Sequence, residues 1–229
     1  MKRSQINAIM ARADEMIRAF GFVLPPFAYW SPAEFRASLP RAAGIVEGRC
    51  GWDITDYGQG DFDRLGLFLF TLRNGRLADL RRGGGMCYAE KLLISRQDQL
   101  SPCHTHVVKA EDIINRGGAT LAVRLNGSNP DGSFSETAGG VVRCDGVERP
   151  YTGGEVIRLA PGESVTLMPG DWHAFWGEGG DVLIGEVSTV NDDLTDNVFR
   201  SPKIGRFSPV EEDEPPLHLL VSDYDRWLS

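Results

Sequence analysis

Between about residue 62 and residue 190 the chain consists of short apolar segments separated by turn sequences. Segments of this length, closed by Gly, Pro, Asn and Asp, are typical of β-strands joined by tight turns. Little of the intervening sequence has the three- and four-residue apolar spacing of a helix. The pattern predicts an antiparallel sandwich or barrel, with strands at 65–72, 88–95, 119–125, 140–143, 155–159, 164–168 and 181–187.

Two helices are predicted before these strands begin. Residues 4–20 repeat apolar side chains at helical spacing, and Ser4 can cap the start of that helix while Gly21 can end it. In the segment SPAE, Ser31 and Glu34 form a capping box that predicts a second helix.

The helices and the strands predict two parts of unequal size. We expect residues 1–61 to form a helical arm that packs on the barrel or on a partner subunit, and residues 62–229 to form the barrel domain. The tail is acidic, and its apolar stretch at 217–221 is expected to return to the sheet as one more strand.

The charge balance excludes several classes of partner. The 229 residues include 24 Lys and Arg against 32 Asp and Glu, a formal net charge of −8. Nucleic-acid binding and docking on an anionic membrane both require a basic face. The start MKRSQINAIM does not resemble a secretory signal, no stretch has the length of an apolar spanning helix, and the four Cys form no CxxC pair. We expect a cytoplasmic protein with reduced thiols that binds neither nucleic acid nor membrane.

Three of the four His residues lie in two short segments that predict a metal site. His104 and His106 occupy alternate positions in SPCHTHVV, so on a strand both rings face the same side. Glu111 follows after a short turn, and His173 comes just after the Pro-Gly turn of LMPGDWHAF. Three imidazoles and one carboxylate leave two positions open on an octahedral divalent ion, which suits a catalytic site better than a closed structural one.

These two segments resemble the two motifs of the cupin superfamily. HTHVVKAE followed by Gly117 and Gly118 is similar to the first motif, and GESVTLMPGDWH is similar to the second, with His173 in the ligand position. The second motif departs from the pattern in having Pro169 directly before Gly170. The resemblance implies a mainly β fold with N-terminal α-helices, built on the double-stranded β-helix (jelly-roll barrel) of the cupins, whose interior holds the metal.

A narrower resemblance covers nearly the whole chain. The D-lyxose isomerase family is similar to it in the segments FGFVLPPFAYWSP, YAEKLLISRQDQLSPCHTHVVKAEDIINRGG and PGDWHAFWGEGGDVLIGEVSTVNDDLTDN. The resemblance implies an aldose–ketose isomerase that interconverts D-lyxose and D-xylulose, and also D-mannose and D-fructose, through an enediol. It further implies a homodimer and one manganese ion per chain. The ligand set itself also accepts Co²⁺, Ni²⁺, Fe²⁺ or Zn²⁺.

Isomerisation of a sugar requires a group that takes a proton from one carbon and returns it to the next. Lys109 lies between His106 and Glu111, within reach of the substrate oxygens, and a cation beside a divalent metal should have a lowered pKa. Glu186 interrupts an apolar strand downstream of His173, where a buried carboxylate needs a partner or a function. The proton transfer stays open between Lys109, Glu111 and Glu186; for Lys109 and Glu186 the alternative is exposure to solvent.

Five further residues are candidates for contact with the sugar. Lys91, on the strand before the first motif, is expected to point inward toward a hydroxyl group. Trp172 and Phe175 flank the last His ligand and can supply an apolar face for the C–H side of a sugar. Asp193 and Arg206 are candidates for sugar contact or for closing the pocket.

Two other functions are compatible with the same ligands. A cupin dioxygenase would hold iron and leave a position for oxygen, but lysines at 91 and 109 make the pocket polar and cationic, which suits a polyol better. A non-catalytic sugar-binding cupin would be expected to carry a DNA-binding module, and neither predicted helix has the basic character that such a module needs.

Overall fold

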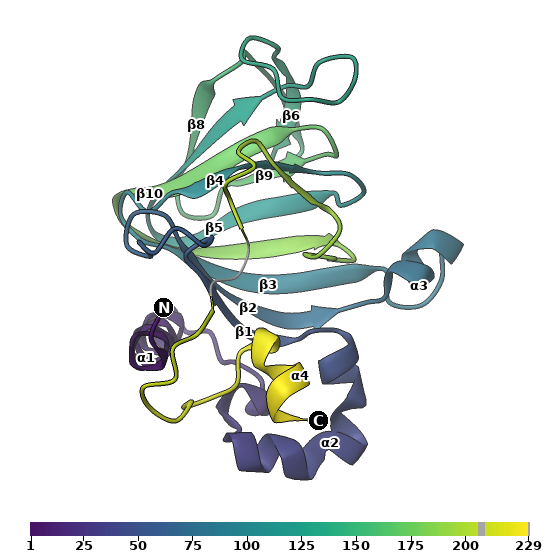
Figure 1. Ribbon diagram of the computed structural model, residues 1–229. Helices are drawn as coiled ribbons and strands as arrows, with labels where there is room; N and C mark the ends of the chain where they lie inside the picture. Colours follow the sequence, from purple (N-terminus) through teal and green to yellow (C-terminus); the bar gives the residue numbers. More distant parts are fainter. Residues whose placement is uncertain (206–208, 229) are drawn as a thin grey trace.

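The computed structural model describes residues 1–205 and 209–228, and strands predominate in it (Figure 1). The helical elements are α1 (Arg3–Ala19), η1 (Pro26–Tyr29), α2 (Pro32–Glu47), α3 (Leu77–Arg82), η2 (Val221–Asp223) and α4 (Tyr224–Trp227). The strands are β1 (Gly51–Thr55), β2 (Leu67–Asn74), β3 (Tyr88–Ser95), β4 (Ser101–His106), β5 (Glu111–Asn126), β6 (Gly140–Cys144), β7 (Val147–Tyr151), β8 (Glu155–Leu159), β9 (Ser164–Leu167), β10 (Trp172–Thr189) and β11 (Asn197–Phe199). No described helix combines the length and the apolar character of a membrane-spanning segment.

Both predicted N-terminal helices are present. α2 follows the predicted capping box, in which the Ser31 hydroxyl accepts from the Glu34 amide and the Glu34 carboxylate accepts from the Ser31 amide. α1 begins at Arg3, so Ser4 lies inside the first turn and does not cap the helix. The helix ends just before Gly21, whose φ of 73° lets the chain turn away, as predicted.

The predicted strands are present, and two of them are longer than the sequence pattern indicates. The segment 119–125 is the second half of β5, and the segment 181–187 is part of β10. The pairing of β5 with β10 continues through register shifts close to the glycine pairs at 117–118 and 179–180. The glycines interrupt the apolar pattern without ending the strand pairing. The sequence pattern therefore predicts a shorter strand in each case.

Two parts of the chain differ from the expected division. β1 lies within residues 1–61 and pairs antiparallel with β2, so the sheet already begins inside the expected helical arm. All five residues of β1 are buried, and a short strand without polar alternation gives little periodic signal. Residues 217–221 form one isolated bridge, between Leu220 and Trp52, instead of a strand. The Asp223 carboxylate accepts from the Leu220 amide, which starts η2 at that point.

The strands of the described residues form a single antiparallel sheet that wraps into a barrel. β10 pairs with β3 along its C-terminal half and with β4 near its start, while β5 pairs first with β9 and then with β8. The two longest strands therefore contribute to both layers of the jelly roll. The apolar interior of the barrel includes Leu93, Ile113, Leu121, Val123, Ile157, Val165, Phe175 and Ile184.

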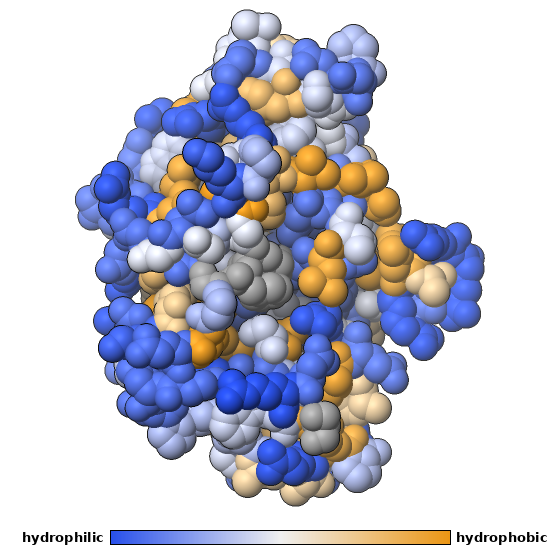
Figure 2. Space-filling view, viewed as in Figure 1, coloured by the Kyte–Doolittle hydropathy of each residue, from blue (hydrophilic) through white to orange (hydrophobic). Residues whose placement is uncertain are grey.

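α1, α2 and α4 lie together on the side of the barrel where β1 is, whereas α3 projects from the end of the sheet between β2 and β3 (Figure 1). Ile6, Met10 and Ile17 of α1 pack in one cluster with Trp52 and Phe70 of the sheet. The surface over α1 that Figure 2 shows is mostly hydrophilic. The apolar stripe of α1 thus forms a second core on the outer face of the sheet.

A buried arginine joins the two ends of the chain. Arg3 is fully buried and makes two bidentate ion pairs, one with Glu212 and one with Asp223, at nitrogen–oxygen distances of 2.8–2.9 Å. Planar guanidinium–carboxylate pairs of this kind fix geometry as well as charge. Arg3 therefore anchors the start of α1 to the C-terminal segment.

Replacing Arg3 with methionine should lower the free energy of unfolding by about 3 kcal/mol, because it leaves the buried carboxylate of Asp223 without its cation. Urea denaturation monitored by circular dichroism measures this difference. Arg18→Met is the matched control: Arg18 lies on the same helix and pairs with Asp14 at the solvent-exposed surface, so its loss should change stability little. Equal effects of the two substitutions would contradict the role of Arg3.

Candidate metal centre

Four predicted ligands converge inside the barrel. His104 and His106 come from β4, Glu111 from the start of β5 and His173 from the start of β10. Pairing of β4 with β10 places His173 directly opposite His104. One ligand atom from each of the four residues lies within 4.8 Å of the other three. The sequence-predicted quartet therefore forms one cluster that could hold a metal ion.

Backbone carbonyls orient two of the three imidazoles. The Nδ1 atom of His104 lies 2.9 Å from the Pro102 carbonyl oxygen, and the Nδ1 atom of His173 lies 3.0 Å from that of Asp171. A ring that donates from Nδ1 to a carbonyl leaves the Nε2 lone pair free. Both rings thus turn Nε2 toward the shared centre.

Burial sets the charge states of the cluster. It holds the pKa of His104 well below the ordinary value, and the neighbouring His173 and His106 rings lower it further. Burial also lowers the pKa of His106, although Glu111 opposes that shift. For Glu111 burial alone would raise the pKa, but the Lys109 ammonium and the His106 ring outweigh it and hold the pKa well below the ordinary value. The pKa shifts at His104, His106 and Glu111 favour neutral rings beside an ionised carboxylate, the protonation states in which such groups bind metals.

The donor set fits a divalent ion. Glu111 Oε1 lies 3.2 Å from His106 Nε2 and 3.1 Å from His173 Nε2. His173 Nε2 is nevertheless buried without a hydrogen-bond partner. A buried polar atom left in this way requires an explanation, and a cation shared by the nitrogen and the carboxylate supplies one. The residues present are therefore suited to an ion such as Mn²⁺.

A polar cluster adjoins the ligands on one side. Lys109 Nζ lies 2.6 Å from Glu111 Oε2 and 3.0 Å from Glu186 Oε1, and Lys91 Nζ lies 3.3 Å from the same Glu186 oxygen. All of these side chains are buried, so exposure to solvent, the alternative considered for Lys109 and Glu186, is wrong, and Lys91 is buried as its expected inward orientation requires. Lys91 and Glu186 are also direct partners across β3 and β10.

The fold surrounds the Lys109 ammonium with carboxylates. Burial alone would lower its pKa, but the carboxylates of Glu111, Glu186 and Asp193 outweigh burial and raise it. The lowered pKa expected from the sequence depends on the charge of a bound divalent ion and stays a prediction. The three carboxylates themselves favour the protonated form of Lys109.

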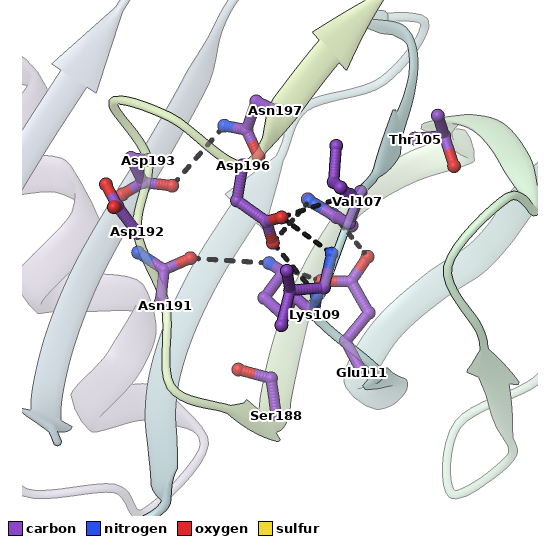
Figure 3. A network of polar contacts seen from close by, with 12 residues as sticks. Thr105, Val107, Lys109, Glu111, Ser188, Asn191, Asp192, Asp193, Asp196 and Asn197 are labelled. Carbon is purple, nitrogen blue, oxygen red and sulfur yellow. Dashed lines mark hydrogen bonds and ion pairs between the residues drawn. The ribbon is translucent and has the colours of Figure 1, made fainter. Parts of the chain in front are cut away.

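The segment 191–197 adds a residue that the sequence analysis missed. Asn191 Oδ1 accepts a hydrogen bond from Lys91 Nζ at 2.6 Å. The same oxygen accepts from Lys109 Nζ at 3.4 Å (Figure 3). Asn74 holds the Asn191 backbone on both sides, accepting from its amide and donating to its carbonyl. In the sequence, NDDLTD resembles an acidic surface stretch. The one feature that could have pointed to Asn191 is the position of this stretch directly after the strand that carries Glu186.

The four other candidates for sugar contact lie in different surroundings. Phe175 lines the cavity above the cluster, and so does Asp193, whose Oδ1 lies 3.7 Å from Lys91 Nζ. Trp172 is not among the residues that line this cavity; its indole donates to Ser128 and packs edge-on against a phenylalanine on the other face of the strand. Arg206 lies outside the described residues.

Both polar and apolar side chains line the cavity. The polar ones include the two lysines, Glu186 and Asp193 together with His104 and His106. The apolar ones are Leu67, Leu69, Leu93, Phe175 and Phe199. A mixed lining of this kind suits a sugar, whose hydroxyl groups and C–H faces need different neighbours.

Comparison with known proteins decides the family. The family model described as D-lyxose isomerase matches residues 1–224. The chain belongs to the D-lyxose isomerase family. The D-lyxose/D-mannose isomerase of Serratia proteamaculans is 45% identical over 233 residues, with 100% of both chains covered. The D-lyxose/D-mannose isomerase of Escherichia coli O157:H7 is 42% identical over 228 residues, with 98% of both chains covered. As a member of this family the chain is an aldose–ketose isomerase acting on a small sugar.

Solved structures of other isomerases share the fold. The L-ribose isomerase of Cellulomonas parahominis superposes with a TM-score of 0.59 at 15% identity, covering 92% of this chain and 98% of that one. The L-ribose isomerase of Geodermatophilus obscurus gives a TM-score of 0.57 at 16% identity with the same coverage. This likeness confirms the predicted cupin-type barrel with N-terminal helices for this member of the D-lyxose isomerase family.

Proposed function

We propose that this chain interconverts D-lyxose and D-xylulose, and D-mannose and D-fructose, with one divalent ion held by His104, His106, Glu111 and His173. The convergence of these four ligands beside a buried pair of lysines and Glu186 carries the proposal. The names of the two curated relatives support the choice of sugars. Mn²⁺ is the proposed ion, and the proposal includes a cytoplasmic homodimer, as the family resemblance implies.

A bound divalent ion supplies a Lewis acid that polarises the sugar carbonyl and makes the neighbouring C–H more acidic. The chain's own residues must then move the proton. Glu186 Oε1 accepts a hydrogen bond from Lys109 and faces Lys91, which makes this carboxylate the base best placed to take a proton from one carbon and return it to the next. Glu111 is less suited to that task, because both of its oxygens already face His106, His173 and Lys109.

The two lysines have a different role in this proposal. Lys109 keeps its proton and donates it, as a hydrogen bond, to oxygen atoms that gain negative charge during enediol formation. Lys91 and Asp193 bind hydroxyl groups further along the sugar. Phe175 lies against the C–H face and excludes water from it.

Removal of metal should abolish turnover. Protein stripped with a chelator is expected to form no ketose from D-lyxose or D-mannose, and added Mn²⁺ should restore the activity, because the four ligands converge on one site. Ketose formation measured before and after stripping tests this, and the ratio of the two rates identifies the preferred sugar. Full turnover without bound metal would contradict metal dependence. Absence of isomerisation with any divalent ion would contradict the proposed reaction, and oxygen consumption with Fe²⁺ would then be measured.

A further inference from the structure

The turn between the ligands His106 and Glu111 joins β4 to β5. The side chains of Val107 and Val108 are 63% and 48% exposed, so packing does little to fix this turn. Lys109 follows directly and is 3% exposed, with its ammonium beside two carboxylates. A turn that carries two ligands and a buried lysine needs a restraint from elsewhere in the fold.

Asp196 supplies that restraint from the segment 191–197 (Figure 3). Its Oδ1 accepts from the amides of Val107 at 3.0 Å and Val108 at 2.7 Å, and its Oδ2 accepts from the amide of Lys109 at 2.9 Å. The Asp196 backbone carbonyl also accepts from the Val107 amide. One buried carboxylate thus binds three successive amides, an arrangement of charge-assisted hydrogen bonds that holds a backbone firmly.

The same carboxylate faces the one ligand imidazole that lacks an orienting partner. His104 and His173 each bond a backbone carbonyl through Nδ1, whereas the Nδ1 atom of His106 is buried without a hydrogen-bond partner. Asp196 Oδ2 lies 3.9 Å from it. An imidazole that binds a metal through one nitrogen carries its proton on the other, and a carboxylate beside that proton fixes the ring.

We propose that Asp196 is a positioning residue for the metal centre: it orients His106 and holds the 107–109 turn, and so sets the distance between the ligands and the Lys109 ammonium. This inference rests on the proposed metal-dependent function. Asp196 acts through His106 and the turn and does not itself bind the ion. Residues that orient metal ligands in this way usually strengthen metal binding by about 10–100-fold.

Titration calorimetry of Mn²⁺ into metal-free protein tests the proposal without any turnover. Asp196→Asn keeps one acceptor oxygen, but it removes the charge and turns an NH₂ group toward an amide. The Mn²⁺ dissociation constant should therefore rise by about 10–100-fold. Asp196→Glu keeps the charge but moves the carboxylate, so its dissociation constant should fall between those of Asp196→Asn and the wild type. If both variants bound Mn²⁺ with wild-type affinity, the inference would be overturned.

Asp192→Asn is the matched control. The Asp192 carboxylate accepts from the amides of Leu194 and Thr195 within its own segment, four residues before Asp196, so its loss should leave the Mn²⁺ affinity unchanged. An equal loss of affinity in this variant would assign the effect to the segment as a whole and overturn the role of Asp196. If Asp196 served stability alone, its replacement would lower the melting temperature while the folded protein kept its Mn²⁺ affinity. That result would also overturn the inference. Failure of the wild type to bind any divalent ion would instead refute the proposed function itself.

Discussion

Replacing Glu186 with glutamine should lower kcat by about 10²–10⁴-fold, the usual contribution of a general base. The amide keeps the volume of the carboxyl group but cannot accept a proton from carbon. Lys109 and Lys91 lie 3.0 and 3.3 Å from Glu186 Oε1, so the glutamine oxygen can still accept from them and the cluster should stay assembled. Metal content should stay at the wild-type level, since Glu186 is not one of the four converging ligands.

The exchange of carbon-bound hydrogen in D₂O measures the same step directly. Wild-type enzyme should incorporate deuterium into the ketose by way of the enediol, and Glu186→Gln should lose that exchange together with kcat. Glu178→Gln serves as the control, because Glu178 lies on the same strand but at the surface, where it pairs with Arg158. Retention of full exchange in Glu186→Gln would transfer the role of base to another residue.

Replacing His106 with alanine should remove the bound metal and lower turnover by about 10³-fold or more, since several kcal/mol of transition-state stabilisation depend on the ion. The side chain is buried, and its Nε2 lies 3.2 Å from the Glu111 carboxylate. The barrel should still fold, because its apolar interior does not include His106. Elemental analysis of the purified variant measures the loss of metal, and circular dichroism measures whether the barrel has folded.

His218 offers a matched substitution outside the site. Its ring stacks on Trp52, and its Nδ1 atom is hydrogen-bonded to the Trp30 carbonyl oxygen, away from the four converging ligands. His218→Ala should therefore keep both the metal and the activity. A His106→Ala variant that turned over at the wild-type rate without bound metal would show that the four converging residues are not the catalytic centre.

The ligand quartet was predictable because each part of it follows from local rules. Alternation along a strand places His104 and His106 on one face, and a turn sequence precedes His173. The inward orientation of Lys91 and Glu186 follows from the same alternation once the barrel is known. Alternation also separates Trp172 from Phe175: Trp172 is one residue from His173 and faces away, whereas Phe175 is two residues away and lines the cavity.

The residues that the sequence did not reveal depend on contacts between distant segments. Asn191 and Asp196 reach the centre because the chain folds back after β10 and pairs β11 with β4. No periodic pattern marks such a return, and short acidic stretches are common on protein surfaces. The carboxylates that raise the pKa of Lys109 could not be predicted for the same reason, since two of them come from residues 77 or more positions further along the chain.

The ion pairs of Arg3 have a consequence for synthesis on the ribosome. Arg3 and Asp223 are separated by 220 residues in sequence, so Arg3 finds this partner only after the intervening barrel strands have been synthesised. Until then the apolar stripe of α1 can cover the sheet only by burying an unpaired guanidinium, which is costly. Stable docking of α1 is therefore expected to follow the folding of the barrel strands and to await the segment that carries Glu212 and Asp223.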